Sequence, residues 1–247
     1  MIRSFSLTDT GRERQLNQDY VYTSEVSVGD FKNLFILADG MGGHKAGDRA
    51  SRVAVETLVE LIKEAPNTHP ELSSFKEIVG HAIAEVNLRV RVESKNNPDF
   101  EGMGTTLVVA MIKDGVLHIA NVGDSRLYVV GREMKQITED HSVVAELVRS
   151  GKLDNDSARM HPKKNLITRA IGAEDDVKAD YFEYTLSEGE LVLMCSDGLT
   201  NMVEDEDIHL IMKVESDLVS MAEALVMKAN ENGGTDNISV VLLQTVD

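Results

Sequence analysis

Four aspartates stand at the ends of strongly apolar segments, and this pattern constrains the fold more than any other feature of the chain. Three segments end at Asp39, Asp124 and Asp197, and a fourth begins at Asp236 (FILAD, HIANVGD, LVLMCSD and DNISVVLL). Short apolar runs of this kind predict buried strands. Because antiparallel strands bring the end of one beside the start of another, the four carboxylates are predicted to meet at one edge of the core.

An Asp-Gly pair is most often an ordinary turn, and one pair in this chain fits that interpretation. Asp114-Gly115 lies between two apolar runs in MIKDGVLHI, which predicts a tight hairpin. Asp39-Gly40 differs, because Met41 and two further glycines follow it instead of a second strand. This carboxylate therefore ends a strand at a place with almost no side-chain bulk behind it.

The other segments arrive in blocks of strands and blocks of helices. Three strands come first, and apolar residues at helical spacing then predict helices over residues 46–65 and 71–93, with a break at Pro66 and Pro70. Residues 141–172 are polar with short helical pieces, and the later elements are strands over 178–186 and 190–195, two helices within 204–231 and a closing strand. This order favours an α+β fold of packed antiparallel sheets flanked by helices. Without a linker or repeat, residues 1–247 are predicted to form one domain.

Composition excludes several classes of protein. The 247 residues carry a net charge of -17, and only 4% are aromatic, so neither the basic surface nor the stacking residues of a nucleic-acid binder are present. The single cysteine permits no intramolecular disulfide and fits a reducing compartment. No signal peptide or membrane-spanning window is visible. We therefore expect a cytoplasmic protein that binds neither nucleic acid nor membrane.

Clustered carboxylates need a neutralising partner. Two unit charges about 4 Å apart repel by roughly 4 kcal/mol at an effective dielectric constant of 20, so protons or cations must accompany them. Because no His or Cys cluster accompanies these acids, oxygen ligands indicate Mg²⁺ or Mn²⁺. Gly40 brings the backbone close enough for its carbonyl to act as a ligand. Two such ions activate water and bind a phosphoryl group.

Competing catalytic motifs fail at particular residues. The spacing from Gly42 to Gly47 resembles a P-loop, but Asp48 stands where that motif requires lysine. A cysteine phosphatase needs an arginine at the position that Asn201 occupies after Cys195. The chain contains no His-Glu-x-x-His, Gly-x-Ser-x-Gly or EF-hand pattern. Metal-assisted hydrolysis is the chemistry that remains.

Eight segments together resemble one protein family, the bacterial metal-dependent (type 2C, or PPM) Ser/Thr protein phosphatases. In chain order these segments are TDTGRERQLNQD, LADGMGGHKAG, GMGTT, ANVGDSRLYVV, DHSVVAELVRSGKL, HPKKNLITRAIG, CSDGLTNMV and GGTDNISVV. The resemblance implies a β-sandwich with α-helices on both sides, in four layers, and a flap over about residues 141–172. It also implies hydrolysis of phosphoserine and phosphothreonine by metal-activated water at a binuclear Mn²⁺ or Mg²⁺ centre.

The resemblance assigns metal ligands residue by residue. Asp39 resembles the carboxylate that bridges the two ions, and Gly40 resembles the carbonyl ligand. Asp197 and Asp236 are similar to the other carboxylates on the first ion. Asp124 resembles a ligand of a third, weaker metal site that is seen in bacterial relatives, and Asp197 is implied as a second ligand of that site.

Three further residues are assigned to catalysis in the same way. Arg14 resembles the guanidinium that binds the substrate phosphate, although Arg12 lies two residues away. Asp19 resembles the acid that orients water bound to the metal. His44 is a candidate proton donor to the leaving group, and an ordinary surface histidine is the alternative interpretation. Relatives often carry glutamate at the position of Gln18. Because the amide of Gln18 brings no charge, the second or third ion is expected to bind more weakly.

The resemblance also implies partners. Phosphorylated proteins are the expected substrates, a cognate Ser/Thr kinase is the expected opposing enzyme, and we expect a monomer. Two alternatives stay open on the sequence. One is a catalytically weak, phosphatase-like module that binds phosphoproteins, and the other is a phosphatase of small phosphoesters.

Overall fold

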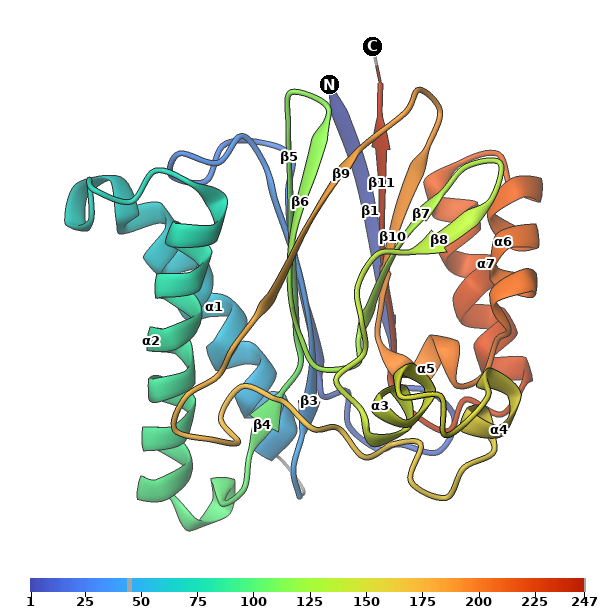
Figure 1. Ribbon diagram of the computed structural model, residues 1–247, viewed down its shortest axis with the longest axis horizontal. Coiled ribbons are helices and arrows are strands. Elements are labelled where there is room, and N and C mark those ends of the chain that lie inside the picture. Colours follow the sequence, from blue (N-terminus) through green and yellow to red (C-terminus); the bar gives the residue numbers. More distant parts are fainter. Residues whose placement is uncertain (44–45, 247) are drawn as a thin grey trace.

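Two antiparallel sheets form the centre of the molecule (Figure 1). The computed structural model describes residues 1–43 and 46–246, with no description of the side chains of residues 155–156. In spatial order, the first sheet contains β1 (Ile2–Asp9), β11 (Ile238–Thr245), β10 (Leu191–Cys195), β7 (Arg126–Val130) and β8 (Met134–Gln136). The second contains β2 (Asp19–Ser24), β3 (Leu34–Met41), β5 (Leu107–Lys113), β6 (Val116–Val122) and β9 (Asp180–Thr185), with the short β4 (Gly104–Thr105) on β3.

Helices cover the outer face of each sheet (Figure 1). α1 (Ala46–Thr68) and α2 (Phe75–Asn96) lie on the second sheet, whereas α6 (Asp205–Val214) and α7 (Leu218–Glu231) lie on the first. The remaining helices are short: η1 (Pro98–Phe100), α3 (Val143–Arg149), α4 (Asn155–Arg159) and α5 (Asp197–Thr200). The order helix, sheet, sheet, helix confirms the predicted four-layer architecture.

The inner strands β5 and β10 are apolar along nearly their whole length because both faces of each sheet are buried there. In β10, Leu191, Leu193 and Cys195 face the α6–α7 layer. Val192 and Met194 face the opposite sheet. Alternate residues therefore enter two different cores, and the run LVLMC has no polar face.

Three helix boundaries differ from the sequence prediction, one of them the end of α2, which lies at Asn96 instead of residue 93. α1 continues through Pro66 to Thr68, although a break at Pro66 was expected. Proline removes one backbone donor, but His69 N still donates to Ala65 O at 2.8 Å, so the turn after Pro66 is retained. α2 begins at Phe75, later than residue 71, because Ser74 and Glu77 form a reciprocal capping box there.

The predicted hairpin at residues 114–115 is confirmed. Asp114 and Gly115 both have positive φ values, 51° and 78°, as a type I′ turn between β5 and β6 requires. Residues 141–172 contain α3 and α4 between long loops, in agreement with the expected short helical pieces. Over the described residues, the molecule has no helix with the length and apolar character needed to cross a membrane.

Candidate metal centre

The aspartates from the strand ends gather at one edge of the sandwich. Asp39 lies near the end of β3, and its cross-strand partner is Asp19 at the start of β2. Asp124 follows β6, Asp197 begins α5 directly after β10, and Asp236 precedes β11. All four of the other carboxylates act electrostatically on Asp39. The sheets therefore bring together five acids that are distant in the chain.

Burial and mutual repulsion raise the pKa values of this cluster. Burial is the main cause at Asp39, and the neighbouring carboxylates hold its pKa still further above the usual range. Burial likewise raises the pKa of Asp19 to about 7 and that of Asp197 to about 6. The pKa of Asp124 is raised by burial first and by Asp197 second. These groups favour either bound protons or a bound cation.

Backbone contacts fix the position of Asp39. Its N–H donates to Thr106 Oγ1 at 2.9 Å, and its carbonyl accepts from Thr106 N and Thr105 Oγ1, each at 2.9 Å. The side chain therefore projects from a backbone that three hydrogen bonds hold. The carboxyl groups of Asp39 and Asp197 lie within hydrogen-bonding reach of each other, which requires a shared proton or a cation between them.

Asp19 has one satisfied and one unsatisfied carboxyl oxygen. Ser196 Oγ donates to its Oδ2 at 2.8 Å. Its Oδ1 is buried and has no hydrogen-bond partner among the described residues. A buried carboxylate oxygen without a partner is rare in proteins and indicates a missing ligand such as water or an ion.

Two glycines allow the backbone segments of the centre to approach one another closely. A Cβ at Gly40 would lie 2.1 Å from Gly47 O and 2.6 Å from Gln18 O. A Cβ at Gly198 would lie 2.0 Å from Asn237 O. All three distances are too short for a real contact, so a side chain at either position would displace the strands that carry the aspartates.

The structure distinguishes Arg14 from Arg12. Arg14 Nη2 forms an ion pair of 2.8 Å with Asp236 Oδ2, and 48% of the Arg14 side chain is exposed. Arg12 lies instead against the loop that contains Gly234, and its backbone N–H donates to Gly234 O at 2.7 Å. Arg14 is thus the arginine at the carboxylate cluster, with a guanidinium that remains open to solvent.

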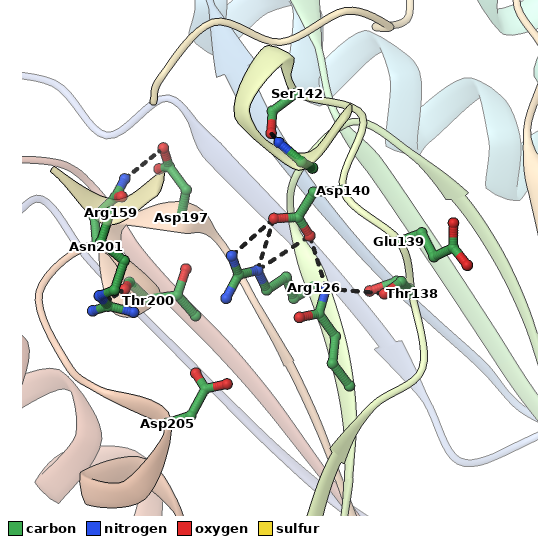
Figure 2. Close-up of polar contacts among 12 residues, drawn as sticks. Arg126, Thr138, Glu139, Asp140, Ser142, Arg159, Asp197, Thr200, Asn201 and Asp205 are labelled. Carbon is green, nitrogen blue, oxygen red and sulfur yellow. Dashed lines mark hydrogen bonds and ion pairs between the residues drawn. The ribbon is translucent and has the colours of Figure 1, made fainter. Parts of the chain in front are cut away.

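A partly buried ion pair supports the side of the centre that carries Asp124. Arg126 and Asp140 are joined through several hydrogen bonds, the shortest 2.8 Å (Figure 2). The Arg126 charge opposes the raised pKa of both Asp124 and Asp197. Asn201 Nδ2 donates to Asp197 Oδ2 at 2.9 Å, which orients that carboxylate.

Sequence reasoning did not identify several residues that position the centre. Asn237 accepts from Gln18 N at 2.8 Å and donates to Thr10 O and Leu16 O, each at 2.9 Å. It therefore joins the start of β11 to the N-terminal loop that carries Arg14. The only sequence signal for a role of Asn237 in the centre is its position next to Asp236. Its contacts themselves join residues more than two hundred positions apart.

The residues present fit divalent cations that keep part of their water shell. Across the described ranges, no group of three or more His, Cys, Asp or Glu side chains is placed so that it could hold a metal ion by itself. Mg²⁺ and Mn²⁺ suit such an open arrangement, because Mg²⁺ usually takes one or two carboxylates and several waters. The buried, mutually repelling acids and the unpartnered Asp19 Oδ1 supply oxygen donors of that type. His44 lies outside the described residues, so its predicted role stays a prediction.

Comparison with known proteins identifies the family. The profile described as protein phosphatase 2C matches residues 9–240. The chain is 42% identical to the serine/threonine phosphatase stp of Listeria innocua over 240 residues, which cover 96% of this chain and 93% of that protein. The crystal structure of the serine/threonine phosphatase Stp1 from Staphylococcus aureus superposes with a TM-score of 0.90 at 33% identity, covering 100% of this chain and 96% of that one.

A further solved structure bears on the metals. The catalytic domain of the serine/threonine protein phosphatase PstP, solved in complex with two manganese ions, has a TM-score of 0.84 and 32% identity, with coverage of 100% of this chain and 99% of that one. The profile match, the identity over nearly the whole length and the shared fold all agree. The chain belongs to the protein phosphatase 2C family.

Proposed function

We propose that Arg14 and the carboxylate cluster are the machinery with which this chain, a metal-dependent Ser/Thr protein phosphatase, removes phosphate from protein side chains. One observation carries the assignment of residues. The only guanidinium ion-paired to the cluster among the described residues is that of Arg14, and it stays half exposed beside five converging acids. An anion-binding arginine next to a cation site is the arrangement that phosphate-ester hydrolysis requires.

Two ions are proposed to be held by the carboxylates of Asp39, Asp197 and Asp236 and by the carbonyl of Gly40. A third ion is proposed to be held by Asp124 together with Asp197. When bound, Mn²⁺ or Mg²⁺ supplies Lewis acidity, which activates water and offsets charge on the phosphoryl group. The residues of the chain position the reactants around it. The phosphate monoester is among the slowest substrates to hydrolyse without a catalyst, so positioning and charge must supply the rate.

Arg14 acts on the phosphoryl group of the substrate, and Asp19 acts on the attacking water. The Arg14 guanidinium donates hydrogen bonds to the non-bridging phosphoryl oxygens, where negative charge is held during transfer. Asp19 Oδ1 has no hydrogen-bond partner among the described residues, and it accepts a hydrogen bond from the attacking water and orients it in line with the leaving group. Ser196 fixes the other oxygen of the same carboxylate at 2.8 Å.

The loop segment of residues 141–172 is proposed to be the flap that shapes access to the site. α4 contacts the site region directly, because Arg159 Nη2 donates to Thr200 O at 3.2 Å (Figure 2). Thr200 is the last residue of α5, the helix that Asp197 begins. This contact supports the proposal that part of the segment lies beside the carboxylate cluster.

The partners follow from the activity. The chain acts on phosphoproteins, and we propose that a Ser/Thr kinase of the same cell supplies them, that the enzyme is a monomer and that it works in the cytoplasm. A phosphatase that reverses a kinase must accept the same phosphorylated residues. The groups identified here contact the phosphate, which all those substrates share.

Replacing Arg14 by alanine is expected to raise KM for a phosphothreonine peptide about tenfold or more, with a smaller fall in kcat. The reason is that charged hydrogen bonds to the phosphate contribute roughly 1.5–3 kcal/mol. Steady-state kinetics in saturating Mn²⁺ measures both constants. Arg12→Ala is the matched control, because Arg12 contacts the neighbouring loop through its backbone. Unchanged KM in Arg14→Ala, or equal effects in both variants, would contradict the assignment.

A further inference from the structure

A groove on the surface of the protein begins at Arg14, the arginine that is ion-paired to the carboxylate cluster. It encloses about 880 Å³, and three separate segments line it: Arg14, Gln15, Leu16 and Gln18 before β2, Gly42 and Gly43 after β3, and residues 98–101 after α2. Pockets that hold drug-sized ligands have volumes of roughly 300–1,000 Å³. The groove is therefore large enough for a phosphorylated residue together with its neighbours.

The wall opposite Arg14 is held in a fixed shape. Asn97 accepts from Asp99 N through its side chain at 3.1 Å, and Ser94 Oγ accepts from Gly102 N at 3.1 Å. Phe100 packs partly into the core beneath α1 and α2, so it anchors the turn. The turn therefore holds the two residues on either side of Phe100 in a fixed position in the groove wall.

Those two side chains are Asp99 and Glu101, and both are exposed acids that line the groove. Neither has an ion-pair partner within the described part of the chain. Leu16, on the other side, is 46% exposed and adds apolar surface. The groove thus has the Arg14 cation and the apolar surface of Leu16 on one wall and two free carboxylates on another.

We propose that Asp99 and Glu101 determine substrate specificity by selecting phosphoproteins with lysine or arginine next to the phosphorylated residue. This inference rests on the proposed function, since it places the phosphate at Arg14. A flanking cation then meets free carboxylates, whereas a flanking acid meets like charge. Exposed ion pairs change affinity only modestly, so the expected preference is about five- to tenfold for the two acids together.

The test compares two phosphothreonine peptides of equal length, one with arginine and one with glutamate on both sides of the phosphothreonine. Wild-type enzyme in saturating Mn²⁺ is expected to show a kcat/KM about five- to tenfold higher for the arginine peptide. The double variant Asp99→Lys/Glu101→Lys is expected to reduce that ratio to one or below. Thermal unfolding of the variant establishes that it is folded.

The net charge of -17 attracts any cationic peptide, so the control must change charge equally elsewhere. Glu133→Lys/Glu188→Lys does so in the exposed turns after β7 and β9, at the end of the sandwich away from the cluster (Figure 1). This control is expected to keep the wild-type ratio. An equal ratio for both peptides in wild-type enzyme, or an equal fall in both double variants, would overturn the groove proposal.

The two proposals fail in different ways. If wild-type enzyme hydrolyses p-nitrophenyl phosphate with Mn²⁺ and releases phosphate from both peptides at equal rates, the groove inference is wrong and the phosphatase function stands. If it hydrolyses neither the peptides nor p-nitrophenyl phosphate, the proposed function is wrong, and the groove inference falls with it.

Discussion

Asp39→Asn is expected to lower kcat on a phosphothreonine peptide by about 10³-fold or more in saturating Mn²⁺. Removal of a single preorganised electrostatic contact in an enzyme typically lowers kcat by about 10²–10³-fold, and Asp39 is the carboxylate on which all the other acids of the cluster act. An amide keeps the shape of the side chain but cannot offset the charge of a cation. Phosphate release measured over a range of Mn²⁺ concentrations gives both kcat and the apparent metal affinity.

The same variant is expected to stay folded and, in chelator, to be more stable than the wild-type protein. Its amide removes one buried, repelled charge, while the three backbone hydrogen bonds of residue 39 remain. Asp114→Asn is a matched control, because it makes the same change at the ordinary hairpin turn, where asparagine tolerates positive φ. Wild-type turnover in Asp39→Asn, or comparable losses in both variants, would contradict the metal-ligand role.

The metal-free protein is expected to lose stability as pH rises from 5 to 8. Burial raises the pKa of Asp197 to about 6 and that of Asp19 to about 7, above the ordinary aspartate value of 3.8. Between these values the folded protein binds more protons than the unfolded chain, so the free energy of unfolding falls with increasing pH. The stability is fully present below about pH 4 and is lost as pH passes through 6 and 7. The loss is on the order of a few kcal/mol.

Urea unfolding at fixed pH values in chelator measures this effect. Excess Mn²⁺ is expected to reverse the slope, since the ion binds the deprotonated carboxylates and stabilises the folded state by mass action. Asp39→Asn is expected to make the metal-free slope shallower. A metal-free stability that increases steadily from pH 5 to pH 8 would show that the cluster does not carry the raised pKa values described here.

The sequence predicted the parts of the fold that depend on local pattern. Continuous apolar runs marked the strands, helical spacing marked α1 and α2, and Asp114-Gly115 marked a hairpin. Helix ends were less accurate, because Ser74 sets the start of α2 through its own hydrogen bonds and α1 passes through Pro66. Caps and proline tolerance depend on packing that a periodicity does not encode.

The meeting of the aspartates was predictable, but the residues that hold them were not. The alternating direction of antiparallel strands was enough to suggest that the strand ends carrying the aspartates meet at one edge of the core. The contact of Ser196 with Asp19 joins residues 177 positions apart, and that of Asn237 with Gln18 spans 219 positions. Such contacts depend on sheet order and register, which an apolar pattern does not specify. The groove was likewise invisible, because three distant segments line it.

The central claim is that the carboxylate cluster is a metal centre that hydrolyses phosphate esters of protein side chains. The most direct test is phosphate release from a phosphothreonine peptide by wild-type enzyme with Mn²⁺, with Mg²⁺ and with chelator. The account predicts release with either ion, none in chelator and recovery when Mn²⁺ is restored. Equal release in chelator, or no release with either ion from folded protein, would contradict it.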